Sequence, residues 1–161
     1  MAGKNNGTAF ERDLQTIFDA YLSQGRAKIH KVDPPTKVLG RKVLFLPNDW
    51  LDFAGTWTER GGRALVIEAK TTQEPTLPLG GERGLTKTQW NNAMDWQRAG
   101  AVVLLLWEFR GEIRVTTPAM AMAACRENER KSLRWCDAHK LPVGHGWVRF
   151  DPLTWAARLT D

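Results

Sequence analysis

Glu68 and Lys70 stand two positions apart in an otherwise apolar segment, 64–70. We interpret this segment as a strand, in which residues two apart point to the same face, about 6.6 Å from each other. Glu68 and Lys70 would then share one face while Ile67 and Ala69 point into the core. Charged side chains on a mostly buried strand are costly unless they are paired or bound to a partner. The alternative is a surface ion pair, because Glu-x-Lys occurs by chance in many proteins.

A second carboxylate, Asp52, precedes Glu68 by sixteen residues. The turn at 59–63 contains two glycines and predicts an antiparallel hairpin of strands 50–57 and 64–70, which places the two carboxylates roughly opposite each other. Neighbouring carboxylates repel unless a cation lies between them, and oxygen ligands suit Mg²⁺. A bound Mg²⁺ polarises a phosphoryl oxygen and lowers the pKa of a bound water. Lys70 would orient that water or stabilise the developing charge.

Asp49 competes with Asp52 for the same role. It follows Pro47 and Asn48, where an aspartate in a turn is expected, and its parity along the strand is opposite to that of Asp52. We therefore favour Asp52.

Hydrophobic periodicity and turn residues predict the elements that position these side chains. A capping box of Thr8 and Glu11 opens a helix that ends at Gly25. The segment 36–49 is either a hairpin turning at Gly40 or a projecting loop. The remaining expected elements are strand 27–32, loop 71–84, helix 85–99, strands 101–109 and 113–116, helix 118–135, loop 141–146, a possible strand 147–150 and a final short helix after Asp151. This order predicts an α/β sandwich around a mixed sheet.

The net charge of +5 is concentrated in one segment, 26–42. The basic residues of this segment, set against the single acid Asp33, are Arg26, Lys28, Lys31, Lys37, Arg41 and Lys42. The rest of the 161-residue chain sums to zero, so the segment is a candidate contact for a polyanion such as nucleic acid. A solvated basic loop without a partner is the alternative.

Several protein classes are excluded by the composition. The longest apolar run, 101–107, is far shorter than the roughly 20 residues of a membrane helix, so no membrane association is expected. The N-terminus is polar and lacks an apolar signal core. Cys125 and Cys136 lack metal-ligand spacing, and reduced thiols in a cytoplasmic protein are the simplest interpretation.

The order and spacing of these motifs resemble the PD-(D/E)xK nuclease superfamily, and within it the RecU/Hjc-type Holliday junction resolvases. The segments that carry the resemblance are 7–11, 25–31, 50–53, 64–72, Gln89 and Gly100 before the apolar strand 101–109. The resemblance implies a single nuclease domain over 1–161 with a restriction-endonuclease-like core, a mixed central β-sheet flanked by helices, at about 4–117. It further implies a projecting stalk insertion at about 34–48. The helical extension at about 118–161 has no counterpart and would serve dimerisation or DNA contact.

The resemblance also implies roles for individual residues. Asp52 and Glu68 would bind Mg²⁺, for which Mn²⁺ substitutes, with the Ala69 carbonyl as a third ligand and Lys70 as the catalytic lysine. Glu11 would reach the metal directly or through water, and Gln89 would support the site from the second helix. The implied DNA contacts are Arg26, Lys28, Lys31, Lys37, Arg41, Lys42, Thr71 and Lys87. The chain departs from the nominal motif in having Leu51 where a proline would precede Asp52.

The implied function is resolution of four-way DNA junctions by a bacterial or phage-encoded homodimer that makes symmetric paired cuts. Two alternatives stay open: another nuclease of the superfamily, such as a restriction-like, flap or nicking enzyme, and a non-catalytic DNA-binding module. Taken by itself, Glu11 is better explained as a capping-box carboxylate, and Gln89 is equally well explained as the capping-box partner of Thr86.

Overall fold

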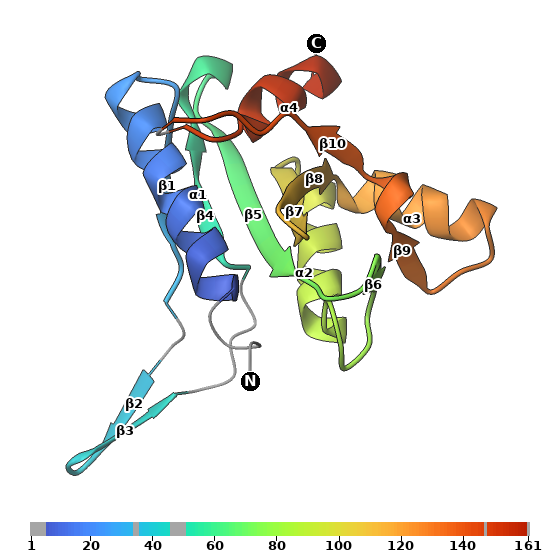
Figure 1. The fold of residues 1–161 in the computed structure, drawn as a ribbon. Coiled ribbons are helices and arrows are strands. Elements are labelled where there is room, and N and C mark those ends of the chain that lie inside the picture. The colour runs from blue at the N-terminus through green and yellow to red at the C-terminus, as the bar shows by residue number, and fades with distance from the viewer. Residues whose placement is uncertain (1–5, 34–35, 46–50, 147, 161) are drawn as a thin grey trace.

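A mixed six-stranded sheet forms the centre of the computed structural model, which describes residues 6–33, 36–45, 51–146 and 148–160 (Figure 1). Its strands, in spatial order, are β1 (Ala27–Lys31), β4 (Phe53–Trp57), β5 (Arg63–Thr71), β7 (Val102–Phe109), β8 (Glu112–Thr116) and β10 (His139–Leu141). β5 and β7 run parallel, and the other neighbours are antiparallel. The carboxyl ends of β5 and β7 therefore meet at one edge of the sheet.

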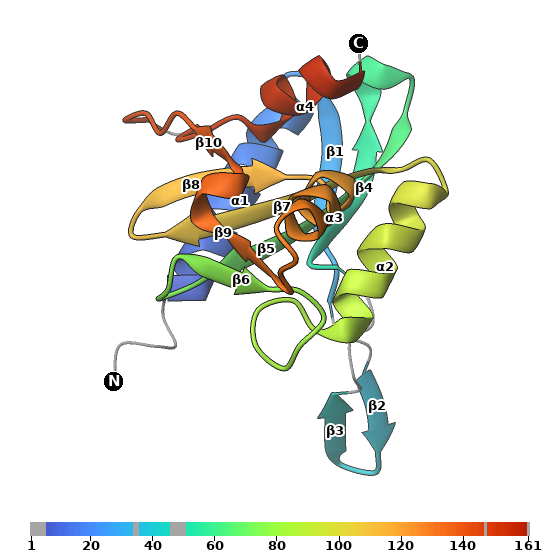
Figure 2. The same ribbon diagram turned by 90° about the vertical axis from the view of Figure 1, so that its right-hand side faces the viewer.

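Helices cover both faces of this sheet (Figure 2). One hydrophobic cluster packs α1 (Asn6–Ser23) and α4 (Pro152–Thr160) against one face. A second cluster packs α2 (Lys87–Arg98), α3 (Pro118–Glu127) and the ribbon of β6 (Thr76–Pro78) and β9 (Ser132–Arg134) against the other. Side chains of β7 alternate between the two clusters, so its nearly continuous apolar sequence reflects burial on both sides. The predicted fold class, a mixed α/β sandwich, is confirmed.

The β4–β5 hairpin is the element that brings the two candidate carboxylates together. A short 3₁₀ turn, Thr58–Arg60, and two glycines in the left-handed region, Gly61 at φ 67° and Gly62 at φ 75°, join the strands. In the resulting register Phe53 pairs with Ile67, which places the preceding residue, Asp52, beside Glu68. The hairpin predicted from the sequence is therefore present.

Residues 36–45 form a separate two-stranded hairpin of β2 (Thr36–Leu39) and β3 (Lys42–Phe45). The chain turns at Gly40, whose φ of 61° suits glycine. The hairpin stands away from the body of the molecule in both views (Figures 1 and 2). Of the two alternatives for this stretch, a hairpin turning at Gly40 and a projecting loop, the structure has the hairpin.

Some predicted boundaries are wrong. α1 begins at Asn6, so Thr8 lies inside the helix and is not its N-cap. The helix expected over 118–135 ends at Glu127. Ser132–Arg134, expected to be helical, is instead β9 and pairs with β6. β6 itself lies within the segment 71–84 that was expected to be a loop. Residues 148–150 form no strand; the sheet instead ends with β10, which pairs with β8.

Candidate active site

Asp52 and Glu68 are joined at the start of β4. The backbone N–H of Asp52 donates to Glu68 Oε2 at 3.3 Å, and the backbone N–H of Ala69 donates to Asp52 Oδ2 at 2.9 Å. Each carboxylate is thereby fixed by the backbone of the other strand. The predicted juxtaposition of the two carboxylates on neighbouring strands is present, whereas Asp49 lies outside the described residues.

Lys70 completes this group from the same strand as Glu68. Its Nζ lies 2.8 Å from Glu68 Oε1, and about a quarter of the lysine side chain is exposed. Glu68 is 1% exposed, so the pair is not a surface ion pair. The ammonium group thus contacts a buried carboxylate at the end of a side chain that is partly exposed.

Burial disfavours the ionised form of both carboxylates. It raises the pKa of Glu68 to about 7, with the neighbouring charge of Asp52 as the second cause and Lys70 acting in the opposite direction. Burial also raises the pKa of Asp52, against the hydrogen bond from the Ala69 N–H. A cation placed between these oxygens would relieve both desolvation and repulsion.

The donor set fits a hard divalent cation. Glu68 Oε1 is buried and, among the described residues, has no donor in hydrogen-bonding geometry although the Lys70 ammonium lies beside it. No three His, Cys, Asp or Glu side chains of the described residues come together as a metal site, so Glu11 does not join the two carboxylates directly. Mg²⁺ is commonly held by one or two carboxylates, with water and substrate phosphate completing its shell. Asp52 and Glu68 satisfy that requirement.

Glu11 lies on α1 and is engaged by another residue, Lys31. Lys31 Nζ forms an ion pair with Glu11 Oε2, and the two side chains are 50% and 34% exposed. The capping-box explanation of Glu11 is wrong, because α1 begins five residues before it. The pairing with Lys31 could not be anticipated from spacing, since the residues are twenty positions apart on different elements.

Gln89 is explained by the start of α2. Its Oε1 accepts from the N–H of Thr86 at 3.1 Å, and its own N–H donates to Thr86 Oγ1 at 3.2 Å. This is the capping box that the sequence offered as the alternative to a supporting role in the site.

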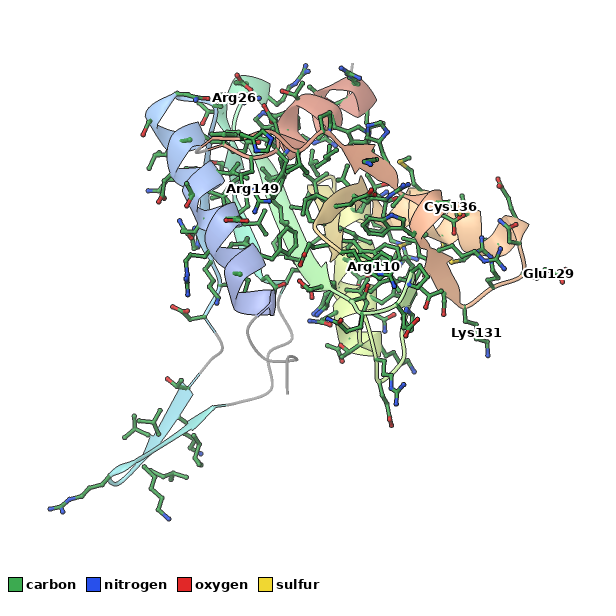
Figure 3. All side chains as sticks on the ribbon, in the orientation of Figure 1. Arg26, Arg110, Glu129, Lys131, Cys136 and Arg149 are labelled. Atoms are coloured by element: carbon green, nitrogen blue, oxygen red, sulfur yellow. The ribbon has the colours of Figure 1, made fainter. Side chains whose placement is uncertain are left out.

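The basic residues of 26–42 do not form one surface. Arg26 lies at the end of the body opposite the β2–β3 hairpin (Figure 3), where it bonds Asp151 at 2.9 Å and Glu59 at 3.2 Å and stacks over Tyr21. The exposed basic residues of the segment are Lys28 and Lys31 on β1 and Lys37, Arg41 and Lys42 on the hairpin. Lys87, also exposed, opens α2.

Glu108 is a charged partner of Thr71 that the sequence analysis missed. β5 and β7 pair in parallel with Thr71 opposite Glu108, and Thr71 Oγ1 donates to Glu108 Oε2 at 3.0 Å. On the next residue, Thr72 Oγ1 accepts from Trp107 Nε1 at 2.7 Å. The sequence contains a signal that could have identified it, because Glu108 is the single charged residue of an otherwise apolar strand.

None of the helices among the described residues has the length and apolar character that crossing a membrane requires. No protein-family model matches the sequence, and no curated protein sequence matches it. Among solved structures, the fold is similar to that of Archaeoglobus fulgidus Hjc, a Holliday junction resolvase from an archaeal hyperthermophile. The TM-score is 0.52 at 19% sequence identity, over 83% of this chain and 95% of that chain. The described part of the chain therefore has the mixed α/β fold of that protein, with the Asp52–Glu68–Lys70 group at the end of its central strand.

Proposed function

We propose that the chain is a Mg²⁺-dependent endonuclease that resolves four-way DNA junctions. The observation that carries the proposal is the pair of half-buried Asp52 and buried Glu68, with Lys70 beside it at the end of β5. Two carboxylates and an ammonium group in this arrangement have no role in packing, yet they provide the charges that phosphodiester hydrolysis needs. The likeness in fold to a solved structure described as a Holliday junction resolvase supports the choice of substrate.

Asp52 and Glu68 would hold the metal, with the Ala69 carbonyl as a third ligand. The cation supplies polarisation of the phosphoryl oxygen and a bound water of lowered pKa. Lys70, whose Nζ contacts buried Glu68 at the end of a partly exposed side chain, is placed to hold the attacking water or to balance charge on the phosphate. Glu11 would act through water, and Gln89 would fix the start of α2 rather than touch the reacting groups.

The β2–β3 hairpin would supply the preference for branched DNA. Within 36–45 three cations, Lys37, Arg41 and Lys42, are exposed and no acid is present. The same hairpin exposes apolar side chains, with Val38 67% and Val43 56% exposed, which no contact with the body covers. A narrow, cationic projection of this kind fits the open centre of a junction and its surrounding phosphates. Lys28, Lys31, Thr71 and Lys87 would contact flanking backbone.

A homodimer follows from the proposed reaction. Two symmetric cuts across a branch point need two sites related by a two-fold axis, and each chain would provide one of them, the Asp52–Glu68 pair.

The proposal is tested by incubating four-way junction, flap, linear duplex and single-stranded DNA in parallel, with and without Mg²⁺. Selective cleavage of the junction is expected, with Mn²⁺ able to replace Mg²⁺. Equal cleavage of flap and duplex would instead indicate another type of nuclease. Tight binding without cleavage in either metal would indicate a non-catalytic DNA-binding module.

A further inference from the structure

Lys31 occupies a defined position at the edge of the carboxylate group. It is the last residue of β1 and pairs with Phe53, the residue after Asp52. The next N–H along the chain, that of Val32, donates to the carbonyl of Asp52 at 2.8 Å. The sheet therefore fixes the backbone of Lys31 beside Asp52, and only the side chain of Lys31 can change its contacts.

The ammonium group of Lys31 contacts one carboxylate that is assigned to the site, that of Glu11. It forms the ion pair with Glu11, and the pKa of Lys31 is raised, first by that hydrogen bond and further by attraction to Asp52 and Asp33. The second ammonium group, that of Lys70, pairs with Glu68. With their side chains ionised, the carboxylates of Glu11, Asp52 and Glu68 and the ammonium groups of Lys31 and Lys70 together carry one net negative charge.

We propose that Lys31 is a positioning residue that withholds Glu11 from the metal and weakens cation binding until DNA is present. The inference rests on the proposed function, because it concerns the same metal. A divalent cation approaching Asp52 and Glu68 meets the repulsion of Lys31 and finds Glu11 already paired. A DNA phosphate is a competing anion for the Lys31 ammonium and would release Glu11 toward the cation. The site would thus be completed by its substrate.

Replacement of Lys31 by an uncharged residue of similar length isolates this role. Lys31→Gln removes the repulsion and frees Glu11, so the DNA-free protein should bind Mn²⁺ about fivefold to tenfold more tightly at low salt, the size expected for one unit charge in a water-screened site. Lys31→Arg retains the charge and should retain wild-type affinity. Glu11→Gln combined with Lys31→Gln removes one anion and one cation together and should return to within about twofold of wild type.

Lys28→Gln is the matched control. Lys28 is an exposed lysine of the same strand, and its backbone pairs with Thr56, at the other end of β1 from Asp52. Its substitution should leave Mn²⁺ affinity unchanged.

Mn²⁺ titration of the DNA-free protein, followed by the electron paramagnetic resonance signal of free Mn²⁺, decides the matter. Tighter binding by Lys31→Gln but not by Lys28→Gln supports the proposal. Wild-type Mn²⁺ binding that Lys31→Gln leaves unchanged or weakens overturns it while sparing the proposed function. Absence of Mn²⁺ binding by both the wild type and Lys31→Gln overturns the proposal. The proposed function fails separately, if the junction is not cleaved in Mg²⁺ or Mn²⁺.

Discussion

The backbone N–H of Asp52 donates to the side chain of Glu68, while the side chain of Asp52 accepts from the N–H of Ala69, the residue after Glu68. This reciprocal arrangement fixes one buried and one half-buried carboxylate without supplying enough donors to neutralise them. Metal-free protein therefore holds unfavourable charge that a cation or a proton relieves.

The first prediction concerns stability and pH. The folded pKa of Glu68, about 7, lies above its ordinary value of 4.5, so the folded protein retains a proton that the unfolded chain releases between these values. Stability from this group is greatest below about pH 4.5 and falls as the pH rises toward 7. Glu68→Gln should remove this loss and stabilise the metal-free protein at pH 8 by on the order of 2–3 kcal/mol, with little effect at pH 4.5.

Urea unfolding of both proteins at the two pH values measures this difference. Mg²⁺ should stabilise the wild type at pH 8 and have less effect on Glu68→Gln. If Glu68→Gln is less stable than the wild type at pH 8, the folded protein stabilises the ionised form of Glu68, which contradicts the prediction.

The second prediction concerns Lys70. Lys70→Met removes the ammonium group beside Glu68 and should lower the rate of junction cleavage by about 10²- to 10³-fold. Binding of the junction, followed by fluorescence anisotropy in Ca²⁺, should change less than about threefold, because one partly exposed cation that is already paired with Glu68 contributes little to affinity. Parallel losses of binding and cleavage would place Lys70 in the DNA interface instead.

The third prediction concerns the β2–β3 hairpin. Changing Lys37, Arg41 and Lys42 together to Ala should weaken junction binding and reduce the slope of log K against log salt by about two to three. Because the hairpin stands apart from the core, the thermal midpoint should be unaffected. An unchanged salt slope would remove the hairpin from the interface.

The fourth prediction separates Arg26 from the other basic residues. Arg26 joins Asp151, Glu59 and the ring of Tyr21, with its side chain 20% exposed. Arg26→Ala leaves Asp151 without its cation and should cost about 1–3 kcal/mol in unfolding free energy. The salt slope of DNA binding should stay at the wild-type value; a reduced slope with unchanged stability would return Arg26 to the DNA interface.

Local sequence signals were sufficient for the centre of the site. Gly61 and Gly62 mark the turn, the strand period places Glu68 and Lys70 on one face, and the turn position sets Asp52 opposite Glu68. These features depend on residues close together in the chain, so single-sequence reasoning reaches them.

Features that depend on contacts between residues far apart in the chain could not be predicted from the sequence. The helix from Pro118 ends early because Ser132–Arg134 pairs with β6, more than fifty residues before it in the chain. The charge of Arg26 predicted a contact with DNA. In the structure Arg26 instead pairs with Asp151, which lies 125 positions away in the chain. Glu11 meets Lys31 only because α1 lies across the first strand.

Mapping of cut sites on a labelled four-way junction, with wild-type protein and Asp52→Asn side by side, tests the central claim most directly. The account predicts paired cuts at symmetric positions by the wild type in Mg²⁺, and undiminished junction binding without cuts by Asp52→Asn. Cleavage by Asp52→Asn at the wild-type rate, or binding of the junction by the wild type with no cleavage in Mg²⁺ or Mn²⁺, would contradict it.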